Sequence, residues 1–185
     1  MHILETKRLI LRTWRQTDLP LMSEINQNPK VMYYFPERQS IMQTKAFIDK
    51  CMDHYKKHGF TFYALELKGT GEFIGFTGIA QVGFVSHFTP AVEIGWRLAY
   101  RHWGEGFAPE AAQAVLTLGF DCFHLPEIIA FCVKENQNSR RVMEKIGMQY
   151  DPQGDFDHPK LAQDSLLKGH VLYRLKADKK TREEY

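Results

Sequence analysis

The feature that most constrains this chain is a strand followed by a glycine-containing turn and a long helix, over residues 91–120. The strand at 91–98 alternates apolar and polar side chains, which is typical of a strand with one buried face. Gly104 and Gly106 allow the backbone of the turn to approach a ligand closely. The helix at 107–120 presents unpaired N–H groups and the positive end of its dipole to that turn. The pattern therefore predicts an anion site suited to a phosphate or pyrophosphate.

Two glycines in a turn before a helix occur in several kinds of connection. A glycine-rich connection that binds nothing fits the two glycines equally well when they are taken alone. A nucleotide P-loop requires GxxxxGK[ST], which the sequence lacks. A dinucleotide fingerprint requires Gly or Ala three residues after Gly106, where this chain has Pro109. Pro109 and Glu110 instead suit the first turn of a helix whose N-terminus faces an anion.

Hydrophobic periodicity predicts a single α/β domain over 1–176, followed by a charged tail over 177–185. Strands are predicted at 8–14, 61–67, 72–82, 91–98, 127–133, 148–150 and 170–175. Helices are predicted from Thr17-Asp18 to Asn28-Pro29, along 44–55 with Gly59 as the stop, over 107–120 and over 136–146. Segments 83–90 and 151–169 are predicted as loops. The strand–helix–strand–helix order from 91 to 147 implies at least one parallel pair of strands.

Composition and charge favour a protein with neither a nucleic-acid nor a membrane partner. The 185 residues include 24 basic and 22 acidic side chains, a formal net charge of +2, so no strong attraction to a polyanion is expected. No apolar run is long enough for a membrane span, and residues 1–19 are too charged for a signal peptide. Cys51, Cys122 and Cys132 show neither a CxxC pair nor metal-ligand spacing. We therefore expect free thiols, no metal and a cytoplasmic location.

Two further blocks of sequence, together with this turn, resemble a known family. Arg101-xx-Gly104-x-Gly106, preceded by the strand VEIGW and followed by PEA, resembles the acetyl-CoA signature of the GNAT superfamily of N-acetyltransferases. The segment 136–148 (NQNSRRVMEKIGM) resembles the N-x-x-S-x-x-V-x-E-K-x-G-F segment of the RimJ/RimL-like branch, which acetylates ribosomal-protein N-termini. The opening 5–12 (ETKRLILR) is similar to that branch's first strand. The resemblance covers nearly the whole chain in the family's order.

The resemblance implies both a fold and a site for acetyl-CoA. The fold is expected to be a central, mixed, mostly antiparallel sheet of about six to seven strands, splayed between strands 4 and 5 and flanked by about four helices. Pantetheine would enter the split, and the pyrophosphate would lie on the backbone amides of residues 101–108. Residues expected at acetyl-CoA are Trp96, Leu98, Arg101, His102, Trp103, Gly104, Glu105, Gly106, Phe107, Ala108, Asn136 and Ser139. Asn136 and Ser139 would face the thiol, although Asn136 is equally suited to capping its helix.

Acetyl transfer from a thioester to an amine requires a neutral amine, a stabilised oxyanion and a proton for the departing thiolate. Backbone N–H groups of residues 93–97 are the candidate donors to the oxyanion. Glu93, on the polar side of its strand, is the candidate general base, with an exposed or ion-paired carboxylate as the alternative. Many members of the superfamily have a tyrosine proton donor where this chain has Met143, which cannot donate a proton. Ser139 is the candidate substitute.

The acceptor amine is left open by the sequence. An α-amine, with a pKa of about 7.7–8.0, becomes neutral more easily than a lysine amine near 10.4. This favours direct attack by a protein N-terminus in a ternary complex. The alternatives are a small-molecule amine, such as a polyamine or an antibiotic, and a non-catalytic acyl-CoA sensor of the same fold. Segments 33–39, 83–90 and 151–169 are expected to shape the acceptor site, and the protein is expected to be a monomer or a homodimer.

Overall fold

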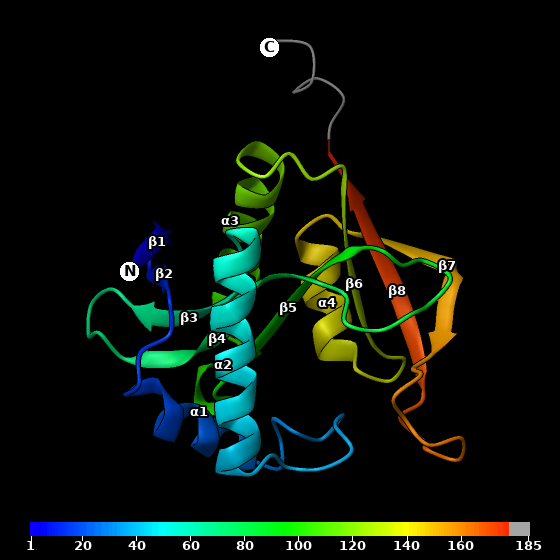
Figure 1. Cartoon of the computed structure of the whole chain (residues 1–185), viewed down its shortest axis with the longest axis horizontal. Coiled ribbons are helices and arrows are strands. Elements are labelled where there is room, and N and C mark those ends of the chain that lie inside the picture. Colours follow the sequence, from blue (N-terminus) through cyan, green and yellow to red (C-terminus); the bar gives the residue numbers. More distant parts are fainter. Residues whose placement is uncertain (178–185) are drawn as a thin grey trace.

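A mixed sheet of eight strands runs through residues 1–177, the part of the chain that the computed structural model describes. The strands are β1 His2–Glu5, β2 Leu9–Arg12, β3 Phe62–Leu67, β4 Phe73–Gln81, β5 Val92–Leu98, β6 Glu127–Val133, β7 Gln149–Asp157 and β8 Gly169–Lys176. They lie in the order β1-β2-β3-β4-β5-β6-β8-β7, and only β5 and β6 are parallel (Figure 1). The mixed, mostly antiparallel sheet is confirmed, with eight strands rather than six to seven. The predicted tail lies outside the described residues except for Ala177.

Four helices accompany the sheet, and local sequence signals explain where most of them begin and end. They are α1 Asp18–Gln27, α2 Ile41–His58, α3 Phe107–Asp121 and α4 Gln137–Lys145. Ser40 and Gln43 form a capping box at the start of α2, and Gly59 ends it in the left-handed conformation. Capping by Thr17 is wrong, because its side chain makes no cap hydrogen bond. The neighbouring Asp18 instead joins a buried ion pair with Arg12, at 2.7 Å.

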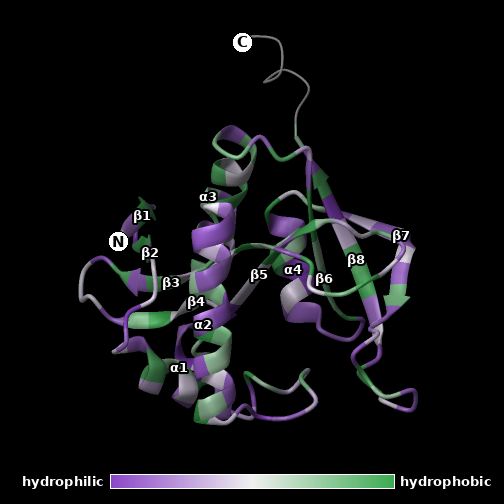
Figure 2. Ribbon diagram, in the orientation of Figure 1, coloured by the Kyte–Doolittle hydropathy of each residue, from purple (hydrophilic) through white to green (hydrophobic). Residues whose placement is uncertain are grey.

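Two hydrophobic clusters occupy the two faces of the sheet. The larger cluster packs the inner side of α3 and α4 against the central strands, and it includes Ile94, Ala112, Val115 and Met143. The smaller cluster packs α1 and α2 against the other face, around Trp14 and Phe76. Figure 2 shows α4 mostly in hydrophilic colours, which agrees with Met143 being its only buried residue. Within residues 1–177 no helix is long and apolar enough to cross a membrane.

The sheet opens between β5 and β6. All seven residues of β5 pair with β4, but only Glu93 pairs with β6, opposite Ile129. The two strands therefore part soon after their first contact. The opening lies between the fifth and sixth strands rather than the fourth and fifth, because β1, which was not predicted, adds a strand before it. Amides of β5 that point away from β4 are left for another partner beyond Glu93.

The edge of the sheet departs from the predicted pattern at β7. The strand was expected to stop at Tyr150, yet it continues to Asp157, so the predicted loop at 151–169 begins only at His158. Pairing with β8 is interrupted by an irregularity between Asp151 and Phe156. An exposed edge strand tolerates prolines, charges and such bulges, which is why its sequence resembles a loop.

Candidate functional site

The turn between β5 and α3 has the geometry of an anion site. Gly104 and Gly106 are in the left-handed conformation, with φ of 83° and 79°. No heavy atom lies within 4 Å of the point where a Cβ on Gly104 would stand, so the backbone there is open to a ligand. Gly106 begins α3 without a side-chain cap, and the first amides of the helix are left for an outside acceptor. This arrangement fits a phosphate-bearing molecule.

The side chains of Arg101 and His102 in the turn contact Glu72. Arg101 Nη2 and His102 Nε2 lie 2.7 and 3.0 Å from Glu72 Oε1, and these contacts lower the pKa of Glu72. The N–H of His102 donates to the Ala99 carbonyl at 3.0 Å, so it is not left for a ligand. The side chains of Arg101 and His102 anchor the turn to the start of β4.

A cation that was not predicted as a site residue does reach the turn. Arg8 Nη1 donates to the carbonyl of Glu105 at 3.0 Å, and Arg8 Nε pairs with Glu110 at 2.6 Å. Its guanidinium also lies 4.3 Å from the ring centre of Phe107. A Cβ on Gly106 would be 3.5 Å from Arg8 Nη2. The only sequence signal for Arg8 was its place in the block 5–12.

The apolar residues predicted at acetyl-CoA mostly pack in or against the larger hydrophobic cluster next to the turn. Leu98 is buried in the larger cluster, and its carbonyl accepts a hydrogen bond from Trp103 Nε1 at 3.0 Å. Trp96, Phe107 and Ala108 pack against the same cluster. Leu98 can therefore meet a ligand only through its backbone.

The start of α4 places Asn136 and Ser139 next to each other. Asn136 Oδ1 accepts a hydrogen bond from Ser139 N at 3.2 Å, so Asn136 acts as the helix cap. The Ser139 side chain is partly buried, and its hydroxyl has no hydrogen-bond partner within residues 1–177. Arg140 donates to Tyr173 Oη at 3.2 Å rather than pointing only to solvent, whereas Arg141 is exposed.

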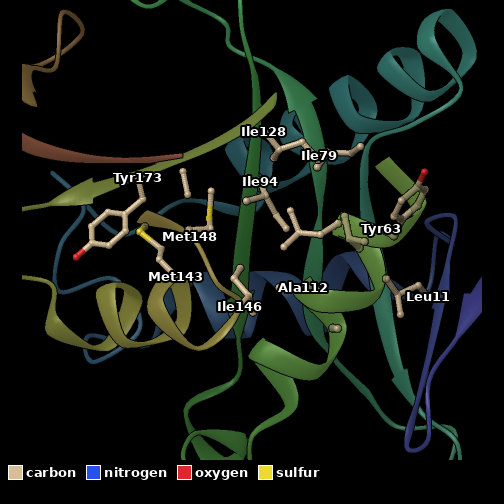
Figure 3. Packing of buried hydrophobic residues seen from close by; sticks show 14 of the residues in the cluster. Leu11, Tyr63, Ile79, Ile94, Ala112, Ile128, Met143, Ile146, Met148 and Tyr173 are labelled. Atoms are coloured by element: carbon tan, nitrogen blue, oxygen red, sulfur yellow. The ribbon is translucent and has the colours of Figure 1, made fainter. Parts of the chain in front are cut away.

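Met143 occupies the position of the missing tyrosine and belongs to the core. It is 2% exposed and lies beside Met148 and Tyr173 (Figure 3). The Tyr173 hydroxyl is held between Arg140 and Glu144, at 3.2 and 3.1 Å. Neither side chain presents a free proton to the opening between β5 and β6.

A cavity of about 230 Å³ adjoins β5 at Glu93. Its lining combines aromatic rings, two histidines, two lysines and one carboxylate. These residues are Phe47, Lys50, Cys51, His54, Thr61, Phe62, Ala80, Gln81, Gly83, Phe84, Glu93, Phe131, His158 and Lys160. Glu93 is also the residue of β5 that pairs with β6, and Phe131 lies two residues beyond that pairing. The cavity thus lies where the two strands begin to part.

Burial controls the protonation of the groups in this cavity. It raises the pKa of Glu93 to about 7, even though Lys50 and Lys160 favour the ionised form. Burial also lowers the pKa of His158 to about 4 and the pKa of His54 below its usual value. Glu93 is therefore poised to gain or lose a proton near neutral pH, while both histidines stay uncharged.

Cysteine chemistry is not favoured in the same region. Burial raises the pKa of Cys51, which lines the cavity, to about 12, and it raises the pKa of Cys132 by as much. A thiol with such a pKa has almost no thiolate at neutral pH. Cys122 is exposed and lies outside the cavity lining.

The segments predicted to shape an acceptor site contribute unequally. Segment 83–90 supplies Gly83 and Phe84, and segment 151–169 supplies His158 and Lys160. Segment 33–39 supplies none of the lining residues. It lies further along β5, where the Phe35 ring stacks on Arg97 at 4.2 Å.

Known proteins resemble this chain in sequence and in structure. The family described as Acetyltransferase (GNAT) domain matches residues 8–149. An uncharacterized N-acetyltransferase of Bacillus subtilis, YnaD, is 36% identical, covering 80% of this chain and 83% of that protein. A GNAT-family acetyltransferase structure from Bacillus anthracis is 30% identical with a TM-score of 0.76, covering 95% and 98% of the two chains. The structure of RimL, a ribosomal L7/L12 α-N-protein acetyltransferase in complex with coenzyme A, shares the fold at 16% identity and a TM-score of 0.75, covering 96% and 99%.

Proposed function

The chain belongs to the GNAT family of acetyltransferases, which use acetyl-CoA, and from that premise we propose that it acetylates a primary α-amine by direct attack in a ternary complex. The turn at 101–108 would bind the pyrophosphate through its backbone amides, and the opening between β5 and β6 would receive the pantetheine. The positive φ angles of Gly104 and Gly106 and the uncapped start of α3 support this placement.

The raised pKa of Glu93, caused by its burial, carries the choice of acceptor. A carboxylate with a pKa of about 7 accepts a proton from a protonated α-amine of pKa about 7.7–8.0 with little change in free energy. The same transfer from a lysine amine near 10.4 is uphill by about 4 to 5 kcal/mol, since each pKa unit corresponds to 1.36 kcal/mol. Glu93 therefore suits a protein N-terminus or a weakly basic small amine as the acceptor.

The roles of the remaining groups follow from the bonds that change. The amine nitrogen bonds to the acetyl carbon, its proton passes to Glu93, and the carbon–sulfur bond breaks as the thiolate leaves. Free N–H groups of β5 would stabilise the oxyanion. The high pKa values of Cys51 and Cys132 favour direct attack over an acetyl-cysteine intermediate.

Thiol release from acetyl-CoA tests the proposed function. At pH 7.5 we expect peptides with a free N-terminus to be acetylated at least about tenfold faster than N-blocked peptides with one lysine, because more of the α-amine is neutral. Mass spectrometry of the products should place the acetyl group on the α-nitrogen. Preference for the lysine peptide contradicts the choice of acceptor, and binding of CoA without thiol release supports the sensor alternative.

Ser139 is our candidate for orienting or protonating the departing thiolate. Its hydroxyl is free within the described residues, and the tyrosine used elsewhere is replaced by the buried Met143. We expect Ser139→Ala to lower kcat by about a hundredfold, the lower end of the usual contribution of acid–base groups. The Kd for CoA should change by less than about twofold, which calorimetry can measure. Full turnover with unchanged Kd would remove Ser139 from the mechanism, and Gln137→Ala in the same helix turn is the matched control.

A further inference from the structure

Two lysines converge at the Glu93 cavity from distant parts of the chain. Lys50 comes from α2 and Lys160 from the loop after β7, and both line the cavity. A Cβ on Gly83 would stand 3.4 Å from Lys50 Nζ and 3.9 Å from Lys160 Nζ. The two ammonium groups are therefore separated by no more than the sum of these distances.

Neither ammonium group is held in a close ion pair by the described part of the chain. Among residues 1–177, neither Lys50 nor Lys160 forms an ion pair within 4.0 Å, whereas several other lysines do. Both lysines are exposed, so their charges lie at the rim, where a ligand can reach them. Two unpaired cations beside the same glycine form an attractive position for an anionic group.

The charges inside the cavity do not cancel these two cations. Glu93 is the single carboxylate among the lining residues, and it is only partly ionised at neutral pH. His54 and His158 are uncharged at that pH, chiefly because burial lowers their pKa values. The cavity is thus positive overall, and an acceptor with additional positive charge would be repelled.

Resting on the proposed transfer to an amine, we propose that the acceptor also carries a carboxylate close to its amine, and that Lys50 and Lys160 bind this carboxylate. The aromatic walls would enclose the carbon atoms between the two groups, and the amine would face Glu93. A volume of about 230 Å³ accommodates one residue or a small molecule of that size. We expect polyamines to be poor acceptors, because Lys50 and Lys160 would repel their additional ammonium groups.

A carboxylate close to an amine occurs in a free amino acid and in an acidic peptide N-terminus, and matched acceptors distinguish the two. A free amino acid is represented by serine, with serine amide as its neutral partner. An acidic peptide N-terminus is represented by the dipeptide amide Ser-Glu, with Ser-Gln as the neutral and Ser-Lys as the cationic partner. Initial rates should be measured at low salt and pH 9, where Glu93 is deprotonated with or without the lysines. Amidation of serine lowers the pKa of its amine, which works against the expected preference.

We expect the wild type to prefer the carboxylate-bearing member of at least one set, through a KM at least about tenfold lower, as for a charge-assisted hydrogen bond. Lys50→Gln and Lys160→Gln should each raise that KM by about tenfold, while kcat and the KM of the neutral partner stay within about twofold. Lys57→Gln, which changes an exposed lysine of the same helix outside the cavity, is the matched control and should leave every KM unchanged.

Binding provides a reading that does not depend on turnover. Calorimetry with CoA-bound protein should show the carboxylate-bearing member binding at least about tenfold more tightly than its neutral partner. The double variant should lose this difference. The assignment is overturned if the charged and neutral partners bind equally in both sets, if Ser-Lys is preferred, or if the preference survives in the double variant. If no compound is acetylated but the binding difference is present, the proposed transfer fails while the anion site stands.

Discussion

Glu93→Gln should lower kcat/KM for an α-amine acceptor by about a hundredfold to ten-thousandfold at pH 7.5, which is the usual contribution of a general base. In the wild type, kcat/KM should fall with an apparent pKa near 7 as Glu93 becomes protonated. In the variant this limb should be missing, and the remaining activity should follow the ionisation of the acceptor amine alone. The deficit should therefore be largest above pH 7, where Glu93 is ionised, and should shrink as the pH falls below 7. Initial rates from pH 5.5 to 9.5 with one acceptor measure both effects.

Stability measurements show whether the loss of activity in Glu93→Gln is caused by unfolding. Burial raises the pKa of Glu93 from 4.5 to about 7, so ionised Glu93 opposes folding above that range, and its cost vanishes below pH 4.5, where the group is protonated in both states. Glu93→Gln should consequently raise Tm at pH 8 and leave it unchanged at pH 4. Glu127→Gln, on the adjacent strand and paired with Arg174 at 2.8 Å, serves as the carboxylate control. A variant that is folded at pH 8 and retains the wild-type pH profile would disprove the role of Glu93.

The sequence was most informative where a function depends on contiguous backbone. The turn at 101–108 is built from one short segment, so its glycines and the helix that follows predict its shape, and the anion site proposed there rests on the same residues. Capping by Asn136 was one of the two alternatives that the sequence left open, and its side chain does cap α4. In these cases the interacting groups lie within a few residues of one another, and no knowledge of the tertiary structure is needed.

The cavity depends instead on side chains that only the fold brings together. Lys50 lies among the hydrophilic residues of α2, and nothing in its spacing distinguishes it from Lys45, which pairs with Asp49 on the exposed surface. Lys160 follows a strand whose polar edge residues resemble a loop. The charge balance around Glu93 is set by these two elements meeting at Gly83. Overall composition could not reveal it, because the net charge of the chain is only +2.

Gly104→Val should raise the Kd for CoA by at least about a hundredfold, as expected when two charge-assisted hydrogen bonds to the pyrophosphate are lost. The protein leaves free space around the position of a Gly104 Cβ, so the new side chain would obstruct a ligand on the backbone rather than the fold. A valine at φ of 83° also imposes strain of about 1–2 kcal/mol.

Gly147→Val separates these two effects. Gly147 has a φ of 82° and is equally free of neighbours within 4 Å, but it follows the end of α4, away from the turn. Both variants should lose similar stability in urea, since both place a β-branched residue in the left-handed region. Only Gly104→Val should lose CoA binding in calorimetry. The turn is proposed to bind through its amides, so equal CoA affinities in the two variants would mean that the pyrophosphate is held elsewhere and that the proposed placement of acetyl-CoA at 101–108 is wrong.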